Sequence, residues 1–282
     1  MGNTSKTLLD QVQATFRHTR AGSIKTRERY LETGRRLAKY LGEQYHVSNL
    51  RNISDKHLEG YVRYLQSQNA SVSHIKTELS AIRFIADHVG LKRPLEAAKT
   101  FNQRMEIGQR HFRGNERLWK PNDLRIIEQA PARIRDVLII ARDMGLRVHE
   151  VHRIDVASAR QAIKSEKLTV KGKNGRVRQV PVRGEVKEVL NRAIESTEPG
   201  HKLFVPPETG THQAIAEVQY YIWSHRPEGS TARIHGLRHG YAQERFQEFR
   251  ERGMSQRDAK LAVSELLGHS RIDVVDIYLS SY

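Results

Sequence analysis

Two arginines, two histidines and a late tyrosine have the side-chain types and spacing that phosphate chemistry needs. Arg147 follows a Gly-Leu pair, His235 and Arg238 stand three residues apart, and His269 precedes Tyr278 by nine residues. A guanidinium grips two phosphate oxygens in a fork, an imidazole moves protons near neutral pH, and a phenol oxygen can hold a covalent ester. The set therefore indicates an enzyme that attacks a phosphodiester through Tyr278.

Each of these residues, taken alone, favours a structural role. Arg147 could pair with nearby Glu150, and His235 could cap the helix that begins there. Tyr278, expected two turns into a C-terminal helix, could be a core aromatic, and we expect His239 to pack in the interior rather than to act in chemistry. Only the combination of all these positions favours catalysis.

The segment from Lys167 to Val182 is predicted to be a β-hairpin. Leucine and valine alternate with other residues on both sides of an Asn-Gly pair, which is a strong signal for a hairpin turn. Lys173 precedes that pair, so its ammonium group could enter a groove of nucleic acid, although a solvated turn lysine is the alternative. Three further cations of the hairpin are predicted DNA contacts: Lys171, Arg176 and Arg178.

The charge balance points to a polyanionic partner. The 282 residues contain 48 Lys and Arg against 32 Asp and Glu, for a net charge of +16. Residues 1–110 hold 19 basic and 10 acidic side chains, and the remainder holds 29 and 22, so the excess is not a detachable tail. Nucleic acid is the most common partner of such a chain, and a basic solubility surface is the alternative.

Composition and spacing argue against several other classes of protein. The chain has no cysteine, which excludes disulfides and thiolate catalysis, and no apolar run of the roughly 18 residues that a membrane helix needs. His149 and His152 are three apart rather than the four of a metalloprotease helix, and His235 and His239 lack an evident third ligand. We expect no metal, no cofactor, and a cytoplasmic, nucleoid-associated protein.

The N-terminal region is predicted to be helical. Helices are expected over about 23–43, from Ser54 onward and over 71–90, the last with an apolar stripe at helical spacing. Lys76 and Arg83 share a face beside that stripe. We expect this face to meet the major groove of DNA, where base edges supply specificity.

The stretch 91–118 contains proline, glycine and many polar residues and is predicted to be a linker. We therefore expect a helical DNA-binding domain with linker over 1–110 and a second domain over 119–282. In the second domain, a buried helix should end at Gly145 and a later one at Gly268. The predicted fold class is mainly α, with a small antiparallel β-sheet in the second domain.

In their order and spacing, these motifs resemble those of the tyrosine recombinases, the family of phage integrases and Xer-type chromosome-dimer resolvases. The family's first arginine motif matches Gly145–Glu150, its hairpin lysine matches Lys173, and its His-x-x-Arg box matches His235–Arg238. Its Leu-Gly-His box matches Leu267–His269, and its nucleophile, nine residues later, matches Tyr278. The resemblance covers most of the chain and is strongest in the second domain.

The resemblance implies a fold, a reaction and partners. The first domain resembles the family's SAM-like, all-α core-binding domain, and the second resembles its α+β catalytic domain. By this resemblance, His235 would accept the phenol proton, His269 would bind a phosphate oxygen, and Lys173 would protonate the departing 5′ oxygen. The product would be a 3′-phosphotyrosyl link and then a Holliday junction, in a homotetramer on synapsed duplex DNA that is monomeric in free solution. The implied catalytic set is Arg147, Lys173, His235, Arg238, His269 and Tyr278.

The chain departs from the family pattern in two places. His149 stands where a small residue is common, and the chain stops four residues after Tyr278, so a helix that docks on a neighbouring subunit is expected to be absent or replaced. Few residues precede the first strong helix, so we expect no separate arm-binding domain. A type IB topoisomerase shares the chemistry, and a non-catalytic DNA-binding protein is the other rival. Integration, excision, resolution and inversion would all use the same residues.

Overall fold

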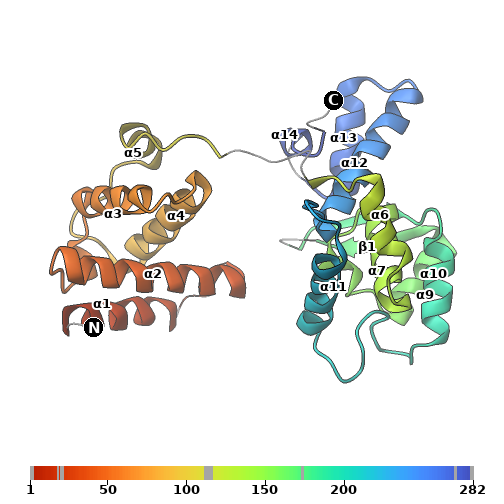
Figure 1. The fold of residues 1–282 in the computed structure, drawn as a ribbon, viewed down its shortest axis with the longest axis horizontal. Helices are drawn as coiled ribbons and strands as arrows, with labels where there is room; N and C mark the ends of the chain where they lie inside the picture. Colours follow the sequence, from red (N-terminus) through yellow and green to blue (C-terminus); the bar gives the residue numbers. More distant parts are fainter. Residues whose placement is uncertain are drawn as a thin grey trace. The chain divides into compact units, whose positions relative to one another are not determined.

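The computed structural model describes residues 3–17, 19, 22–110, 117–172, 175–269 and 272–279. The chain divides into two compact units, Met1–His111 (unit 1) and Phe112–Tyr282 (unit 2), and each has a hydrophobic core of its own (Figure 1). None of the helices in these ranges is long and apolar enough to cross a membrane.

Unit 1 is built from helices. Ser23, Ser54 and Ser71 stand at the N-caps of α2, α3 and α4, because a serine hydroxyl can accept from the unpaired N–H groups of a first helical turn. Gly90, at φ +65°, ends α4, so the three helices predicted from the sequence are confirmed. The described elements are α1 Asn3–Arg17, α2 Ile24–Gln44, η1 Leu50–Asn52, α3 Asp55–Ser67, α4 Val72–Val89 and α5 Ala98–Arg104.

Helix α5 corrects the predicted linker. Phe101 is fully buried, and Met105 and Ile107 join it in the core of unit 1. Arg104 of the same helix pairs with carboxylates of Glu59 and Glu96, each at 2.6 Å. Residues 91–110 therefore pack as part of unit 1; the few apolar residues among many polar ones were too sparse to reveal this helix. Residues 111–116 lie outside the described ranges.

A buried glutamate ties three helices of unit 1 together. Glu78 of α4 is 1% exposed and accepts hydrogen bonds from the Thr33 hydroxyl at 2.8 Å and the Tyr61 hydroxyl at 2.9 Å. Arg36 donates to both carboxylate oxygens, at 2.6 and 3.3 Å. Burial alone would raise the pKa of Glu78, but these hydrogen bonds, led by that of Arg36, lower it.

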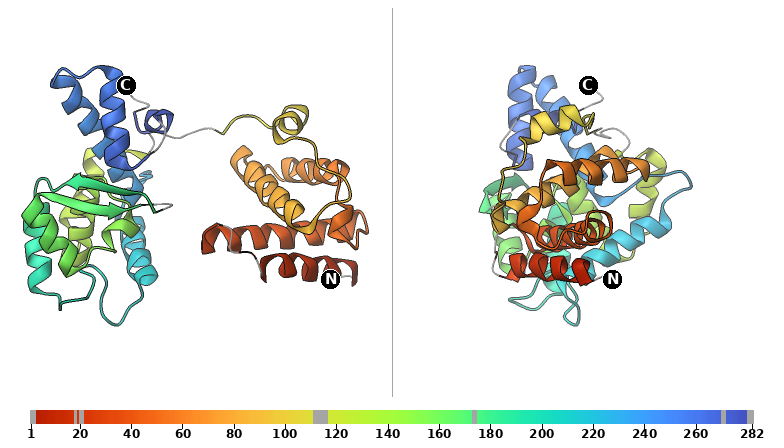
Figure 2. Two further views of the ribbon diagram at one scale, coloured as in Figure 1. Left: turned by 180° about the vertical axis from the view of Figure 1, so that it is seen from behind. Right: turned by 90° about the vertical axis from the view of Figure 1, so that its left-hand side faces the viewer.

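Unit 2 surrounds the buried helix α7, which packs against α6, α8, α10 and α12 (Figure 2). The hairpin of β1 and β2 lies against this helical body, with β1 on α9 and β2 on α13. Helix α7 ends at Gly145 as predicted, in the left-handed conformation. The described elements are α6 Pro121–Glu128, α7 Ala132–Met144, α8 Val148–Val151, α9 Val156–Ser165, β1 Lys167–Lys171, β2 Val177–Pro181, α10 Val186–Glu195, α11 Thr211–His225, α12 Ile234–Glu251, α13 Gln256–Leu267 and α14 Asp273–Asp276.

The two predicted strands of the hairpin are confirmed. They pair antiparallel from Lys167 opposite Pro181 to Lys171 opposite Val177. Beyond the last pair, the N–H of Gly172 donates to the carbonyl of Arg176 at 2.7 Å. Lys173 and Asn174 lie outside the described residues.

The C-terminal segment holds Tyr278 by packing rather than by a long helix. Helix α14 is a single turn, and Tyr278 follows it by two residues, so the prediction that it lies two turns into a helix is wrong. Tyr278 and Leu279 are buried in a small core that they share with α12 and α13. The physical reason is that Val275, Tyr278 and Leu279 gain more by entering this core than by extending one helix.

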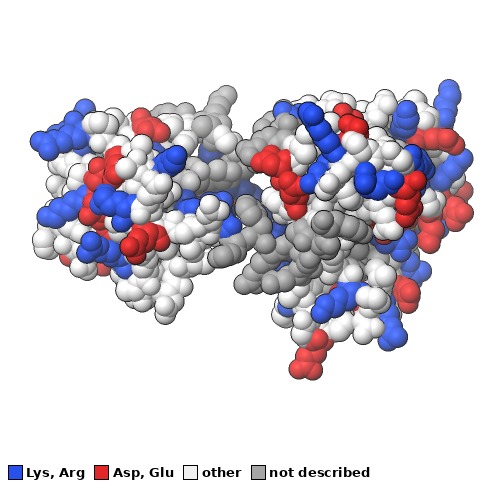
Figure 3. Space-filling model, turned by 90° about the horizontal axis from the view of Figure 1, so that it is seen from above, with Lys and Arg blue, Asp and Glu red and all other residues white. Residues whose placement is uncertain are grey.

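Basic and acidic side chains are interspersed on the face of each unit that Figure 3 shows. The net charge of +16 is therefore not gathered into one patch on that face.

Candidate active site

Arg238 is at the centre of the candidate site and is fully buried. It lies in the first turns of α12, on the same face as His235 and His239. One terminal nitrogen donates to the carbonyl of Gly145 at 2.5 Å, and the other donates to the carbonyl of Leu267. These two carbonyls end α7 and α13, so one guanidinium joins the C-termini of two helices to the start of a third.

Gly145 permits this arrangement because no other residue fits there. Its φ is +60°, and a Cβ would lie 2.3 Å from the ring of Tyr241. The chain turns directly after Gly145, which places Arg147 at the N-cap of α8. The first arginine of the predicted set therefore owes its place to a turn that requires glycine.

Glu150 binds three arginines of the site. Its carboxylate is buried and accepts from the side chain of Arg147 at 3.1 Å and from the backbone N–H of Arg147 at 2.9 Å. Arg178 of β2 donates to both carboxylate oxygens, at 3.0 and 2.8 Å. A terminal nitrogen of Arg238 lies 4.0 Å from the same carboxylate.

The site therefore holds one negative group among three positive ones. Burial would raise the pKa of Glu150, but the hydrogen bonds and charge of Arg178, with those of Arg147 and Arg238, lower it to about 2. Burial, followed by the charge of Arg147, lowers the pKa of Arg238 to about 10, so its guanidinium stays protonated at neutral pH. Two positive charges remain uncompensated beside Tyr278.

Three histidine rings surround Tyr278, which is 5% exposed. The centroid of its ring lies 4.4 Å from that of His239, 5.5 Å from that of His269 and 5.9 Å from that of His235. His269 also approaches Arg238, with Nε2 3.4 Å from a guanidinium nitrogen. Arg238, Tyr278 and the imidazoles are thus part of one cluster.

The imidazoles of this cluster are neutral at pH 7. Burial lowers the pKa of His235 to about 4, with a further contribution from the charge of Arg238. The same two causes, in the same order, lower the pKa of His269 to about 4. For His239, burial and then nearby His235 lower the pKa to about 3. A neutral imidazole can accept a proton, which is what a base for the Tyr278 phenol must do.

The structure brings five of the six predicted catalytic residues into this cluster and leaves the sixth undescribed. Arg147, His235, Arg238, His269 and Tyr278 lie together. Lys173 is outside the described residues, although the hairpin that carries it borders the site through Arg178.

The predicted DNA contacts of the hairpin fall into two groups. Lys171 is the last residue of β1 and Arg176 directly precedes β2, and both are exposed. The side chain of Arg178 is only 8% exposed and is held by Glu150 and by the carbonyl of Leu266 at 2.8 Å. This pairing corrects the expectation that Arg178 reaches DNA, because its donors are already used inside the protein.

In unit 1, the two predicted contacts on α4 also differ. Lys76 is half-exposed beside the exposed Ser73 and Ser80. Arg83 donates to the carbonyl of Glu96 at 2.7 Å and lies over the ring of Phe101. Lys76 therefore remains the better candidate for a DNA contact, and Arg83 fastens α4 to the segment before α5.

Sequence reasoning missed two features of the site. From the sequence, Glu150 is only a possible partner that would give Arg147 a structural role. An acidic side chain three residues after an N-cap is, however, itself a capping signal. The contact of His239 with Tyr278 had no sequence signal beyond its place next to Arg238. Among the described residues, no group of three His, Asp or Glu side chains is arranged to hold a metal ion.

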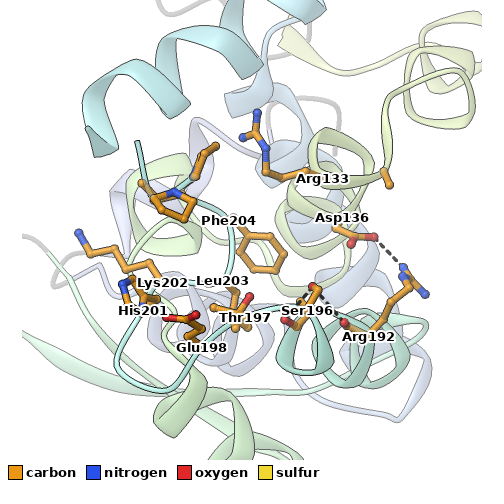
Figure 4. A pocket seen from close by; sticks show the side chains of 15 residues that line it. Arg133, Asp136, Arg192, Ser196, Thr197, Glu198, His201, Lys202, Leu203 and Phe204 are labelled. Atoms are coloured by element: carbon orange, nitrogen blue, oxygen red, sulfur yellow. Dashed lines mark hydrogen bonds and ion pairs between the residues drawn. The ribbon is translucent and has the colours of Figure 1, made fainter. Parts of the chain in front are cut away.

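A cavity of about 630 Å³ in unit 2 is lined by other residues (Figure 4). Leu203 and Phe204 form apolar parts of its wall, and Asp136 and Arg192 form an ion pair at 2.7 Å on one side. None of the candidate catalytic residues that the structure describes lines it.

The chain is similar to known DNA recombinases along most of its length. Residues 118–282 match the phage integrase family, and residues 8–96 match the N-terminal SAM-like domain of phage integrases. The tyrosine recombinase XerC of Vibrio parahaemolyticus serotype O3:K6 is 25% identical over 284 residues, which cover 96% of this chain and 87% of the relative.

Two solved structures share the fold. The Tn1549 transposon integrase in complex with transposon right end DNA has a TM-score of 0.66 at 14% identity, over 96% of this chain and 94% of that one. A lambda integrase dimer bound to a COC′ core site has a TM-score of 0.64 at 16% identity, over 96% of this chain and 76% of that one. At these identities the likeness concerns the fold, an all-α N-terminal domain followed by an α+β domain.

Proposed function

The chain belongs to the phage integrase family, and on this premise we propose that it is a site-specific tyrosine recombinase that cuts and rejoins duplex DNA. Members of the family break and rejoin DNA strands, so the substrate is DNA and the protein is an enzyme. The proposed route is a 3′-phosphotyrosyl intermediate followed by a Holliday junction.

One observation carries this proposal: a buried phenol ring lies among neutral histidines next to a surplus of guanidinium charge. Arg147, Arg178 and Arg238 face the single carboxylate of Glu150. Arg178 is enclosed, whereas the side chain of Arg147 is 23% exposed and can meet a ligand. A phosphodiester would supply the missing negative charge at the place where Tyr278 lies.

In the proposed cleavage step, the oxygen of Tyr278 attacks the scissile phosphorus. A bond forms between that oxygen and phosphorus, and the bond from phosphorus to the 5′ oxygen breaks. His235 accepts the phenol proton, and Lys173 gives a proton to the departing 5′ oxygen. Arg147 and Arg238 stabilise the charge that builds on the phosphate oxygens. Arg238 can do so because its Nε has no hydrogen-bond partner among the described residues, whereas all three guanidinium nitrogens of Arg178 are in use.

In the rejoining step, a 5′ hydroxyl of a partner strand attacks the phosphotyrosyl link and releases Tyr278. One phosphate ester replaces another at each step, so the reaction needs no nucleotide hydrolysis. Exchange of one pair of strands produces a Holliday junction, and exchange of the second pair resolves it. We assign these reaction steps to a homotetramer on two synapsed duplexes. The tetramer assembles from a protein that is monomeric in free solution.

Both units would contact the duplex. Unit 1 offers Lys76 on α4, and unit 2 offers Lys171 and Arg176 beside the hairpin loop. Phosphate contacts of this kind supply much of the affinity and make it sensitive to salt. A DNA substrate places the working protein with the nucleoid.

The Tyr278→Phe variant tests the proposal. The DNA substrate is first selected from a library of randomised duplexes by its binding to this variant. A nicked form of the selected duplex is then used to trap the cleaved product. We expect the variant to bind like the wild type and to form no DNA adduct that survives denaturant. A denaturant-resistant adduct in the variant would show that another residue is the nucleophile.

A second variant tests the role of Lys173. Lys173→Ala should slow cleavage far more than it weakens binding, because its proton is needed only by the leaving oxygen. A duplex with a bridging sulfur in place of the 5′ oxygen should restore the rate, since a thiolate leaves without a proton. Equal loss of binding and cleavage would reduce Lys173 to a phosphate contact.

An assay with a mixture of two marked duplexes distinguishes the proposed recombinase from the two alternative functions. A recombinase exchanges partners and gives recombinant duplexes. A type IB topoisomerase-like enzyme would relax supercoiled DNA and give none, and a non-catalytic binding protein would give neither product nor adduct.

A further inference from the structure

His239 of α12 is buried in a way that packing alone does not explain. It is 1% exposed, and neither ring nitrogen has a hydrogen-bond partner among the described residues. Leaving a buried donor and acceptor unpaired costs free energy that a phenylalanine of similar size would not incur. The imidazole therefore points to a hydrogen bond that is made in another state of the site.

The nearest polar side chain in this cluster that could serve is Tyr278. Its ring centroid lies 4.4 Å from that of His239, with 35° between the planes, and this is the shortest of its three histidine contacts. His235 meets the edge of His239 at 5.3 Å, nearly perpendicular, and completes the enclosure. The face of His239 thus supports the ring that carries the nucleophilic oxygen.

The charge state of His239 suits a neutral donor. Burial, and then the nearby His235, Arg117 and Arg238, hold the pKa of His239 well below its usual range, so the ring stays unprotonated at neutral pH. A neutral imidazole carries one N–H donor and one acceptor. Such a donor can fix a phenol oxygen without adding a further positive charge beside the guanidiniums.

We propose that His239 is a positioning residue for the nucleophile. In the free protein its ring face supports the Tyr278 ring. In the DNA-loaded site the phenol moves off that face, and one N–H of His239 donates to the Tyr278 oxygen, which leaves the phenol O–H directed to His235. This inference rests on the proposed function, because it requires Tyr278 to attack the phosphate.

Single-turnover cleavage of the selected nicked duplex, at saturating protein, tests the proposal. His239→Phe keeps a ring against Tyr278 but removes the donor, so cleavage should slow about tenfold while the dissociation constant for DNA stays the same. His239→Ala removes ring and donor and should slow cleavage further. His239→Gln keeps a side-chain N–H and should be faster than His239→Ala.

His152 provides a matched control within unit 2. It is also fully buried with an unpartnered Nε2, and its Nδ1 lies 2.8 Å from the Val148 carbonyl rather than beside Tyr278. His152→Phe measures the general effect of replacing a buried histidine and should leave the cleavage rate of the folded protein at the wild-type value.

A bridging-sulfur duplex separates nucleophile positioning from leaving-group protonation. The defect of His239→Phe should persist on this duplex, whereas that of Lys173→Ala should disappear. Wild-type cleavage by His239→Phe, or rescue of its defect by the sulfur, would overturn the inference while leaving the proposed function intact. Absence of any adduct with the wild-type protein would overturn both.

Discussion

Two buried glutamates, one in each unit, are held by arginine in ways that suit different tasks. Glu78 in unit 1 meets a single guanidinium, that of Arg36, together with two hydroxyl groups. Glu150 in unit 2 meets three guanidiniums, and one of them, that of Arg238, is fully buried. The first cluster is balanced in charge, and the second has a surplus of two positive charges.

The difference separates a structural cluster from a binding site. A balanced buried pair needs no further partner and serves to join helices α2, α3 and α4. Buried charge without a counterion is unfavourable, so the surplus in unit 2 is compensated only when an anion binds. A buried ion pair alone therefore does not indicate an active site, whereas an imbalance of charge next to a candidate nucleophile supports the proposed one.

We expect the largest effect from a change at Arg238, whose guanidinium joins the helix ends of the site and, in the proposed reaction, binds the phosphate. Arg238→Lys should lower the single-turnover cleavage rate by about 10²–10³-fold, because the single nitrogen of an ammonium cannot span the carbonyls of two helices and a phosphate as the planar guanidinium does. Arg36→Lys alters the balanced cluster and should leave cleavage of bound DNA unchanged. Similar loss of cleavage in both variants would remove the distinction between the clusters.

The next effect concerns stability and can be assigned to each unit separately. Glu150→Gln and Glu78→Gln each break a buried ion pair, and each should lower the free energy of unfolding of its unit by about 3 kcal/mol. Both tryptophans, Trp119 and Trp223, lie in unit 2. Trp fluorescence therefore reports the unfolding of unit 2, and far-UV circular dichroism reports both units.

We expect the fluorescence transition to shift for Glu150→Gln only. Saturating DNA should stabilise wild-type unit 2 more than this variant, because the guanidinium cluster is no longer organised to bind phosphate. A fluorescence shift of equal size in Glu78→Gln would mean that the two clusters are not independent.

A smaller effect follows from pH. The pKa of His239 is about 3 in the folded protein and that of His235 about 4, both below the ordinary 6.5, so the unfolded chain binds protons first as pH falls. Stability of unit 2 is therefore fully present above about pH 7 and decreases from about pH 6.5 to pH 4. Each such histidine lowers the free energy of unfolding of unit 2 by about 2 kcal/mol as the pH falls from 6.5 to 5. This loss lowers the melting temperature by about 5 °C.

The fluorescence transition should follow this pH dependence, and His239→Phe should weaken it. Unit 1 responds in the same direction but at lower pH: the lowered pKa of Glu78 stabilises it above about pH 4.5, so its transition should change mainly at more acidic pH. A fluorescence midpoint that stays constant from pH 7 to pH 5 would contradict the assigned protonation states.

The smallest effect is expected on the DNA-facing side of unit 1. Lys76→Ala should weaken DNA binding a few-fold and reduce the slope of log affinity against log salt concentration by about 1. Lys56, exposed on α3, serves as the matched control and should leave that slope unchanged when replaced by alanine. Equal slopes for the two variants would place Lys76 away from the phosphates.

Helix boundaries were accessible from the sequence where a local signal fixed them. Serine at an N-cap and glycine at the C-terminal end bound the helix over 72–89, and the apolar stripe between them gave its buried face. The resemblance to the tyrosine recombinases and the mixed, mainly α fold class are confirmed. The roles of the six catalytic residues stay predictions.

The missed features depend on contacts between distant segments. Helix α5 forms because Phe101 finds a core supplied by α3 and α4, and a short polar helix has little local signal of its own. Arg178 was expected to face DNA because its partner Glu150 stands 28 residues earlier in the chain. The sequence predicts Tyr278 inside a helix because it has no local signal that ends α14 at Asp276. The helix ends there as Tyr278 and Leu279 pack into the C-terminal core.

The sequence by itself determined which reactive side chains are present, their order, and the turns and helix ends that carry them, since these depend on neighbours a few residues away. Tertiary structure decided that three guanidiniums share one carboxylate and that His239 supports Tyr278. Apart from the local pair of Arg147 and Glu150, those contacts join residues that are 28 to 88 positions apart, and only the packing of unit 2 brings them together.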